Sequence, residues 1–148
     1  MNPGDLAPDF TLPDHHGRDF TLSAALANGS VVLFFYPAAM SKGCTKESCH
    51  FRDLAAEFAA VGAQRVGISM DSVSRQQQFA DANALDYPLL ADVGGHVARL
   101  YGVKRAVDLL RVRRATFVIG VDGRLLDVIT SELSMDVHAD RALRALSA

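Results

Sequence analysis

The sequence predicts an α/β fold in which a mixed central sheet is flanked by helices and extended by an N-terminal β-hairpin. A continuous apolar run at Val31–Tyr36 has the length and the β-branched and aromatic content of a strand buried on both faces. Helical spacing of apolar residues follows, and a second apolar run at Arg65–Met70 completes a β-α-β unit with parallel strands. Asp122-Gly123, between two further apolar runs, is a strong hairpin signal that adds an antiparallel pair.

Length and composition predict a single domain over residues 1–148. The chain is 49% hydrophobic, enough for one core, and no Pro/Gly/Ser linker divides it. A net charge of −2 removes the electrostatic argument for a nucleic-acid partner. Because there is neither a run of 18 apolar residues nor a visible secretory signal, we expect no membrane association and a cytoplasmic protein.

The N-terminal segment predicts the added hairpin. Asp9–Leu12 and Asp19–Leu22 are strand-like, and Pro13–Gly17 between them is rich in turn residues. His15 and His16 lie in this turn, where we expect them to be exposed to solvent.

A helix is predicted from Cys44 to about Ala60, after Pro37 ends the strand at Val31–Tyr36. Gly62 closes this helix. Four apolar residues at positions i, i+3, i+4 and i+7 give it one buried stripe: Phe51, Leu54, Ala55 and Phe58.

A second helix is predicted over Val73–Ala84, with Ser72 or Asp71 as its N-cap. A short strand at Leu89-Leu90 and a short helix at Val97–Tyr101 follow.

The last elements are a hairpin of Thr116–Val121 and Arg124–Ile129 and a C-terminal helix with apolar residues at helical spacing between Ala139 and Leu146. The core order is therefore β-α-β, helix, β-β, helix. It is similar to the order of the thioredoxin-like fold.

The only two cysteines, Cys44 and Cys49, are too few and too close to form a disulfide scaffold, so we interpret them as reactive. Cys44 follows a strand and a turn containing Gly43, and it opens a helix. Unpaired N–H groups and the helix dipole favour a thiolate at that position. Ser41 can cap the helix and offer its hydroxyl to the same pocket. The alternative is that Cys44 is a small buried hydrophobic residue.

Cys49 cannot bond to Cys44 while the helix between them is intact. Residues i and i+5 lie about 7.5 Å apart along a helix and roughly 140° apart around it, whereas a disulfide needs Cα atoms within about 7 Å and converging Cβ atoms. Pairing therefore requires local unwinding. The alternative is that Cys49 only fills a helix face.

The sequence Cys-x4-Cys-His also invites a metal site, with His50 as the third donor. No fourth partner stands at the usual spacing, so we expect no metal and no cofactor.

Pro37-Ala-Ala-Met-Ser-Lys-Gly-Cys44 matches the active-site pattern of peroxiredoxins: Pro, three residues, Thr or Ser, two residues, Cys. Gly43–Asp53 resembles the bacterioferritin comigratory protein (peroxiredoxin Q) subfamily, in which a second cysteine lies five positions after the first. Gly4–Pro13, Val31–Tyr36 and Arg114–Phe117 also look like that family, so the resemblance covers most of the chain.

The resemblance implies a thiol-dependent peroxidase for hydrogen peroxide and organic hydroperoxides. Cys44 would attack the peroxide and become a sulfenic acid, and Cys49 would resolve it as an intramolecular disulfide. Thioredoxin or a similar dithiol would then reduce the disulfide. Pro37 would shield the oxidised sulfur from water, Gly43 would support the turn, and Ser41 would bond to the peroxide and the thiolate. Such proteins are often monomeric, so a monomer or weak homodimer is expected.

By the same resemblance, Arg114 would bring positive charge to the thiolate and the peroxide, and Glu47 would orient Arg114. Three alternatives stay open. Arg114 could belong to a solvated basic rim, Arg113 could take its place, and Glu47 could be an ordinary acid in the first turn of a helix.

The chain departs from the peroxiredoxin Q pattern in the apolar residues after Pro37, namely Ala38, Ala39 and Met40. We hypothesise that these residues shift the substrate preference of the protein towards organic hydroperoxides.

Two alternative functions are a thioredoxin-like thiol–disulfide oxidoreductase and a non-catalytic redox-sensing module. The Cys-x4-Cys spacing, and Ala115 where a cis-proline would precede the strand, count against the oxidoreductase.

Overall fold

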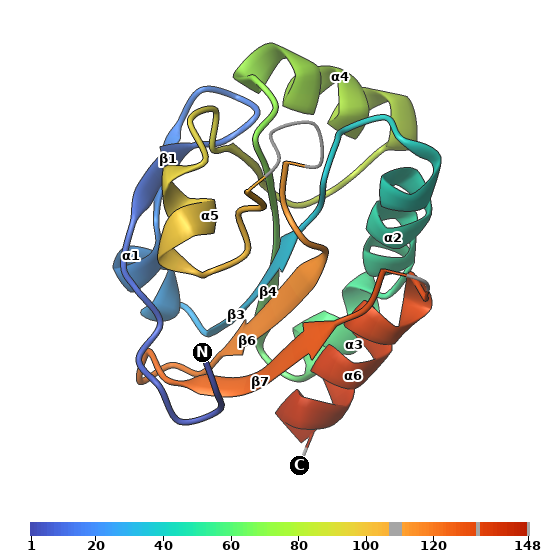
Figure 1. Cartoon of the computed structure of the whole chain (residues 1–148). Helices are drawn as coiled ribbons and strands as arrows, with labels where there is room; N and C mark the ends of the chain where they lie inside the picture. The colour runs from blue at the N-terminus through green and yellow to red at the C-terminus, as the bar shows by residue number, and fades with distance from the viewer. Residues whose placement is uncertain (107–110, 133, 148) are drawn as a thin grey trace.

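Five strands form a mixed central sheet with helices on both faces (Figure 1). The computed structural model describes residues 1–106, 111–132 and 134–147. The strands are β3 Ser30–Phe35, β4 Ala63–Ser69, β5 Leu89–Ala91, β6 Ala115–Ile119 and β7 Leu125–Thr130. Their order is β5-β4-β3-β6-β7. The pairs β3–β4 and β4–β5 are parallel, while β3–β6 and β6–β7 are antiparallel. The predicted fold class is confirmed.

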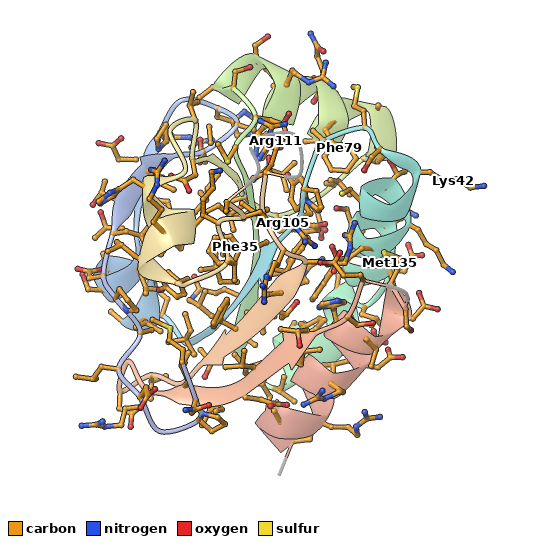
Figure 2. The ribbon with its side chains drawn as sticks, viewed as in Figure 1. Phe35, Lys42, Phe79, Arg105, Arg111 and Met135 are labelled. Atoms are coloured by element: carbon orange, nitrogen blue, oxygen red, sulfur yellow. The ribbon has the colours of Figure 1, made fainter. Side chains whose placement is uncertain are left out.

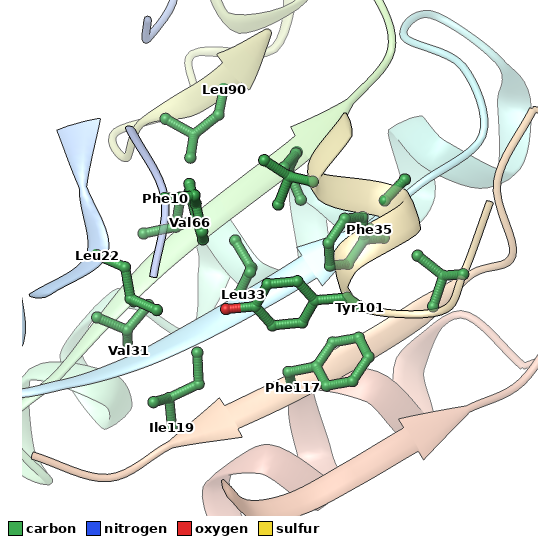
Figure 3. Close-up of a cluster of buried hydrophobic side chains, with 14 of the residues drawn as sticks. Phe10, Leu22, Val31, Leu33, Phe35, Val66, Leu90, Tyr101, Phe117 and Ile119 are labelled. Carbon is green, nitrogen blue, oxygen red and sulfur yellow. The ribbon is translucent and has the colours of Figure 1, made fainter. Parts of the chain in front are cut away.

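The helices are α1 Leu22–Leu26, α2 Lys42–Asp53, α3 Ala55–Ala60, α4 Val73–Asn83, α5 His96–Leu100 and α6 Asp136–Ser147. Alternate residues of β3 divide the core in two. Val31, Leu33 and Phe35 pack with residues of α1 and α5 (Figure 3). Val32 and Phe34 pack with residues of α2, α3, α4 and α6 on the other face. Period-2 alternation thus explains why the strand is apolar throughout.

Aromatic stacking fixes α2 to the sheet. The rings of Phe34 and Phe51 are stacked, with centroids 4.1 Å apart, and both side chains are fully buried. Phe51 also stacks on Phe58 of α3 at 5.7 Å. The helix that carries both cysteines is therefore anchored through the middle of its buried face.

The added hairpin is present as a separate two-stranded sheet of β1 Thr11–Pro13 and β2 Asp19–Thr21. The expected exposure of His15 is wrong: its side chain is buried, and Nδ1 accepts a bond from Leu89 N at 3.2 Å because the turn packs against β5. His16 is exposed. The strand expected to reach Leu22 ends at Thr21, because Leu22 begins α1 and is buried under the sheet.

The predicted single helix from Cys44 to Ala60 is also wrong in detail. It begins at Lys42, and Leu54, with φ −96° and ψ 21°, separates α2 from α3. Arg65 Nη1 donates to Phe51 O at 3.0 Å, so a side chain from β4 satisfies a carbonyl in the last turn of α2. Over the described ranges, no helix has the length and apolar content needed to cross a membrane.

Candidate active site

Cys44 lies in the first turn of α2, where the chain enters the helix from the end of β3. Its side chain is fully buried. Ser41 is the N-cap of α2, and its Oγ accepts a bond from Cys44 N at 3.4 Å. The sulfur therefore lies at the positive end of a twelve-residue helix, as the spacing predicted.

The guanidinium of Arg114 joins Cys44 to Glu47. Nη2 lies 3.2 Å from Cys44 Sγ, and Nη1 donates to Glu47 Oε1 at 2.6 Å. Arg114 is 6% exposed and Glu47 is fully buried, so this contact is shielded from solvent. Arg113 is exposed. Arg114, rather than Arg113, is therefore the arginine that faces the thiol.

Glu47 is subject to two opposing effects. Burial raises its pKa to about 8, and the charge and hydrogen bond of Arg114 oppose this rise. Oε1 can accept the bond from Arg114 whether or not Oε2 carries a proton. A protonated Glu47 orients the guanidinium without neutralising its charge. The positive charge of Arg114 can then stabilise a thiolate at Cys44.

His138 completes the buried cluster, and we did not predict it from the sequence. Its Nε2 faces Ser131 O at 2.9 Å and must donate, because a carbonyl only accepts. Nδ1 lies 2.8 Å from Thr116 Oγ1 and 3.7 Å from Glu47 Oε2. Burial lowers the pKa of His138, so the ring is neutral and Nδ1 accepts from Thr116. The only sequence signal was its place beside the apolar stripe of α6.

Asp71 is a second polar residue that sequence reasoning did not assign to the site. The sequence predicts it only as one of two candidate helix caps, and Ser72 takes that role by accepting from Arg75 N at 3.2 Å. Asp71 is 4% exposed, and its Oδ2 accepts from Ala39 N at 2.7 Å. Its position two residues after the end of a parallel strand is the available signal, because polar residues at such strand ends meet at one edge of the sheet.

Cys49 lies further along α2, partly buried, with Sγ 3.7 Å from Asn83 Oδ1 at the end of α4. Both cysteines are free, and the helix between them is continuous. This agrees with the expectation that the pair is not bonded while α2 is intact.

The remaining predicted residues lie in the loop that enters α2 and in the first turn of that helix. Ser41 Oγ donates its one proton to Ala38 O at 2.9 Å, so it meets any further partner as an acceptor. A Cβ on Gly43 would lie 3.4 Å from both Arg114 Nη2 and Met135 Sδ, so Gly43 leaves little spare room beside the guanidinium. Pro37 is partly buried at the start of the loop. Figure 2 shows Met135 between α2 and α6.

His50, the third donor of the metal alternative, points elsewhere. Its Nε2 lies 2.9 Å from Asp140 Oδ1, so it joins α2 to α6. Within residues 1–106, 111–132 and 134–147, no group of three or more His, Cys, Asp or Glu side chains is arranged to hold a metal ion.

Comparison with known proteins agrees with the chemistry that the geometry of the site indicates. The sequence profile of the AhpC/TSA family matches residues 3–128. Peroxidoxin BcpB from Mycobacterium tuberculosis is 58% identical, and its crystal structure superposes with a TM-score of 0.96 over 99% of this chain and 97% of that chain. Chloroplastic peroxiredoxin Q from Arabidopsis thaliana is 36% identical, over 100% of this chain and 68% of that protein.

A third relative is the bacterioferritin comigratory protein of Xanthomonas campestris, whose structures concern its alkyl peroxide reduction activity. It is 28% identical, with a TM-score of 0.88 over 99% of this chain and 98% of that chain. Together with the buried thiol and its arginine, these matches confirm the resemblance seen in the sequence. The chain belongs to the AhpC/TSA family and is a peroxiredoxin of the peroxiredoxin Q group, a thiol-dependent peroxidase.

Proposed function

We propose that the protein reduces hydrogen peroxide and organic hydroperoxides at Cys44 and resolves the product with Cys49. The observation that carries this proposal is the position of Arg114, whose guanidinium contacts both the sulfur of Cys44 and the carboxyl group of Glu47. A fixed cation in a dry pocket stabilises a thiolate before reaction and the developing negative charge during it.

In the first step, the Cys44 thiolate attacks the outer oxygen of the peroxide, and the O–O bond breaks. Sulfur is oxidised to sulfenic acid, while the departing oxygen takes up one proton and leaves as water or an alcohol. Arg114 holds its positive charge beside both sulfur and oxygen. Ser41 accepts a hydrogen bond from the peroxide, and Pro37 limits the access of water.

In the second step, Cys49 attacks the oxidised sulfur, a disulfide forms and water leaves. This step requires the first turns of α2 to unwind, because the two cysteines are separated by an intact helix. A thioredoxin or a similar dithiol then reduces the disulfide and restores both thiols. We place this cycle in the cytoplasm, in a single-domain monomer or weak homodimer without a metal or cofactor.

The apolar loop after Pro37 supports a preference for organic hydroperoxides. Met40 is 44% exposed, Ala39 is buried beside it, and Met135 lies near Gly43. The Xanthomonas relative is described as having alkyl peroxide reduction activity, and alkyl peroxides are organic hydroperoxides. We expect a larger rate constant for cumene hydroperoxide than for hydrogen peroxide in competition kinetics. An equal or faster reaction with hydrogen peroxide would contradict this preference.

The proposed function is tested by following peroxide consumption with thioredoxin as the reductant. Cys44→Ser should abolish consumption. Cys49→Ser should reduce one equivalent of peroxide and then fail to be recycled efficiently by thioredoxin. A wild-type protein that consumes no peroxide would reject the proposal and favour a redox-sensing module.

A further inference from the structure

The carboxylate of Asp71 joins several segments around the active site, although no step of the proposed reaction uses it. Oδ2 accepts bonds from Ala39 N and Ser69 Oγ, both at 2.7 Å. Oδ1 accepts from Arg111 Nη1 at 3.1 Å and lies 3.5 Å from Arg75 Nε. A carboxylate that is 4% exposed and has this many donors is strongly held in one orientation.

Two of these contacts reach the backbone segments that deliver the reacting pair. Ala39 lies in the loop that enters α2, five residues before Cys44, while Arg111 lies three residues before Arg114. The sulfur of Cys44 and Nη2 of Arg114 are 3.2 Å apart. A small movement of either segment would change that distance. The carboxylate of Asp71 therefore influences the positions of both Cys44 and Arg114.

The same two segments contain backbone conformations that need support. Met40 has φ 68° and Arg111 has φ 55°, in the left-handed region that side chains with a Cβ rarely adopt. Such residues persist when their surroundings hold them. Met40 directly follows the N–H that Asp71 binds, and the guanidinium of Arg111 is itself bound to Asp71.

A buried network of hydrogen bonds helps to fix the orientation of the Asp71 carboxylate. Tyr36 Oη donates to Gln76 Oε1 at 2.6 Å, and Gln76 Nε2 donates to Ser69 Oγ at 2.9 Å, so the proton of Ser69 is directed to Asp71. Burial alone would raise the pKa of Asp71, but the bonds from Ala39, Ser69 and Arg111 hold it below its ordinary value of 3.8. The group is therefore an anion at neutral pH.

We propose that Asp71 is a positioning residue that holds the start of α2 closed and so sets the balance between peroxide attack and disulfide formation. The inference rests on the proposed function, because only the resolving step needs α2 to open. With the Asp71 contacts in place, Arg114 stays on the sulfur and attack is fast. The same contacts oppose the unwinding that brings Cys49 to Cys44, which leaves the sulfenic acid exposed to a second peroxide and to sulfinic acid formation.

The test compares Asp71→Asn with a matched control, Asp127→Asn. Asp127 on β7 is held by Arg141 of α6 at 3.2 Å, and no hydrogen bond among the described residues joins it to the loop that enters α2. We expect Asp71→Asn to slow the reaction with hydrogen peroxide by about tenfold to a hundredfold, the usual scale for small misplacements of reacting groups. It should also speed disulfide formation and lower the fraction of Cys44 sulfinic acid at high peroxide, measured by quenched-flow mass spectrometry. The control should change none of the three.

Opposite shifts in the two steps would support the inference, whereas slowing of both steps or no change would overturn it. Arg111→Gln removes one donor to Asp71 and should give the same pattern in weaker form, which covers the case in which Asp71→Asn does not fold. If the wild type consumes peroxide without forming a Cys44–Cys49 disulfide, the resolving half of the proposed function is wrong and this inference falls with it. If the wild type forms the disulfide and Asp71→Asn changes neither the attack step nor the disulfide-forming step, only the inference about Asp71 is overturned.

Discussion

At Glu47, burial and an arginine act on the same carboxyl group in opposite directions. The carboxyl is fully buried, one oxygen accepts from Arg114 at 2.6 Å, and the other has no hydrogen-bond partner among the described residues. Burial has the larger effect, so the pKa of Glu47 rises to about 8. When Glu47 carries its proton, the positive charge of Arg114 stays available to the sulfur of Cys44.

This raised pKa predicts a pH-dependent contribution to stability. Because the folded state binds the proton of Glu47 more tightly than the unfolded state, the contribution is complete below the ordinary pKa of 4.5 and is lost as pH rises through about 8. The difference in unfolding free energy between the wild type and Glu47→Gln should therefore fall from about pH 5 to about pH 8.5.

Urea denaturation of both proteins across this range measures the difference. Glu57→Gln, at an exposed position of α3, is the control and should follow the wild type. A difference that stays constant or grows with pH would show that Glu47 is ionised throughout.

At the scale of the element, α2 has two requirements that its sequence meets in different places. Its first turn presents Cys44 and opens in the proposed resolving step, whereas its middle stays attached to the sheet. The stacked rings of Phe34 and Phe51, 4.1 Å apart, supply that attachment. The opening proposed for disulfide formation can then be confined to the residues between Ser41 and Cys49.

We expect Phe51→Ala to lower the unfolding free energy by about 3–5 kcal/mol, because it removes a fully buried ring and leaves a cavity. Urea denaturation gives the value. Leu126→Ala, at a side chain that is 47% exposed on β7, should stay within about 0.5 kcal/mol of the wild type. A loss for Phe51→Ala no larger than that of this control would contradict the anchoring role.

At the scale of the whole molecule, the sequence predicted what depends on local patterns. The β3–β4 pair, the hairpin at Asp122-Gly123 and the cap at Ser41 all follow from neighbouring residues. Beside the interruption at Leu54, the carbonyl of Phe51 is bound by Arg65, 14 residues away. Local spacing cannot show a contact of that kind.

The candidate site likewise contains residues that local sequence patterns predict and residues that they do not. Cys44, Ser41 and Cys49 were found from one short segment, and Arg114 from a motif. His138 and Asp71 were not found, because their partners come from distant strands and helices: Thr116 for His138, and Ala39 for Asp71. The buried position of His15 was missed for the same reason, since Leu89 is 74 residues away.

The proposed reaction cycle requires Cys49 to resolve Cys44 within one chain, and one measurement tests this step. Trypsin cleaves after Lys42, Lys46 and Arg52, so the two cysteines fall in separate peptides, Gly43–Lys46 and Glu47–Arg52. After one equivalent of hydrogen peroxide, we expect mass spectrometry without reduction to find these peptides joined by a disulfide, in protein that remains a single chain. Oxidation confined to Gly43–Lys46 as sulfinic or sulfonic acid, with Cys49 still a free thiol, would show that Cys49 does not resolve Cys44.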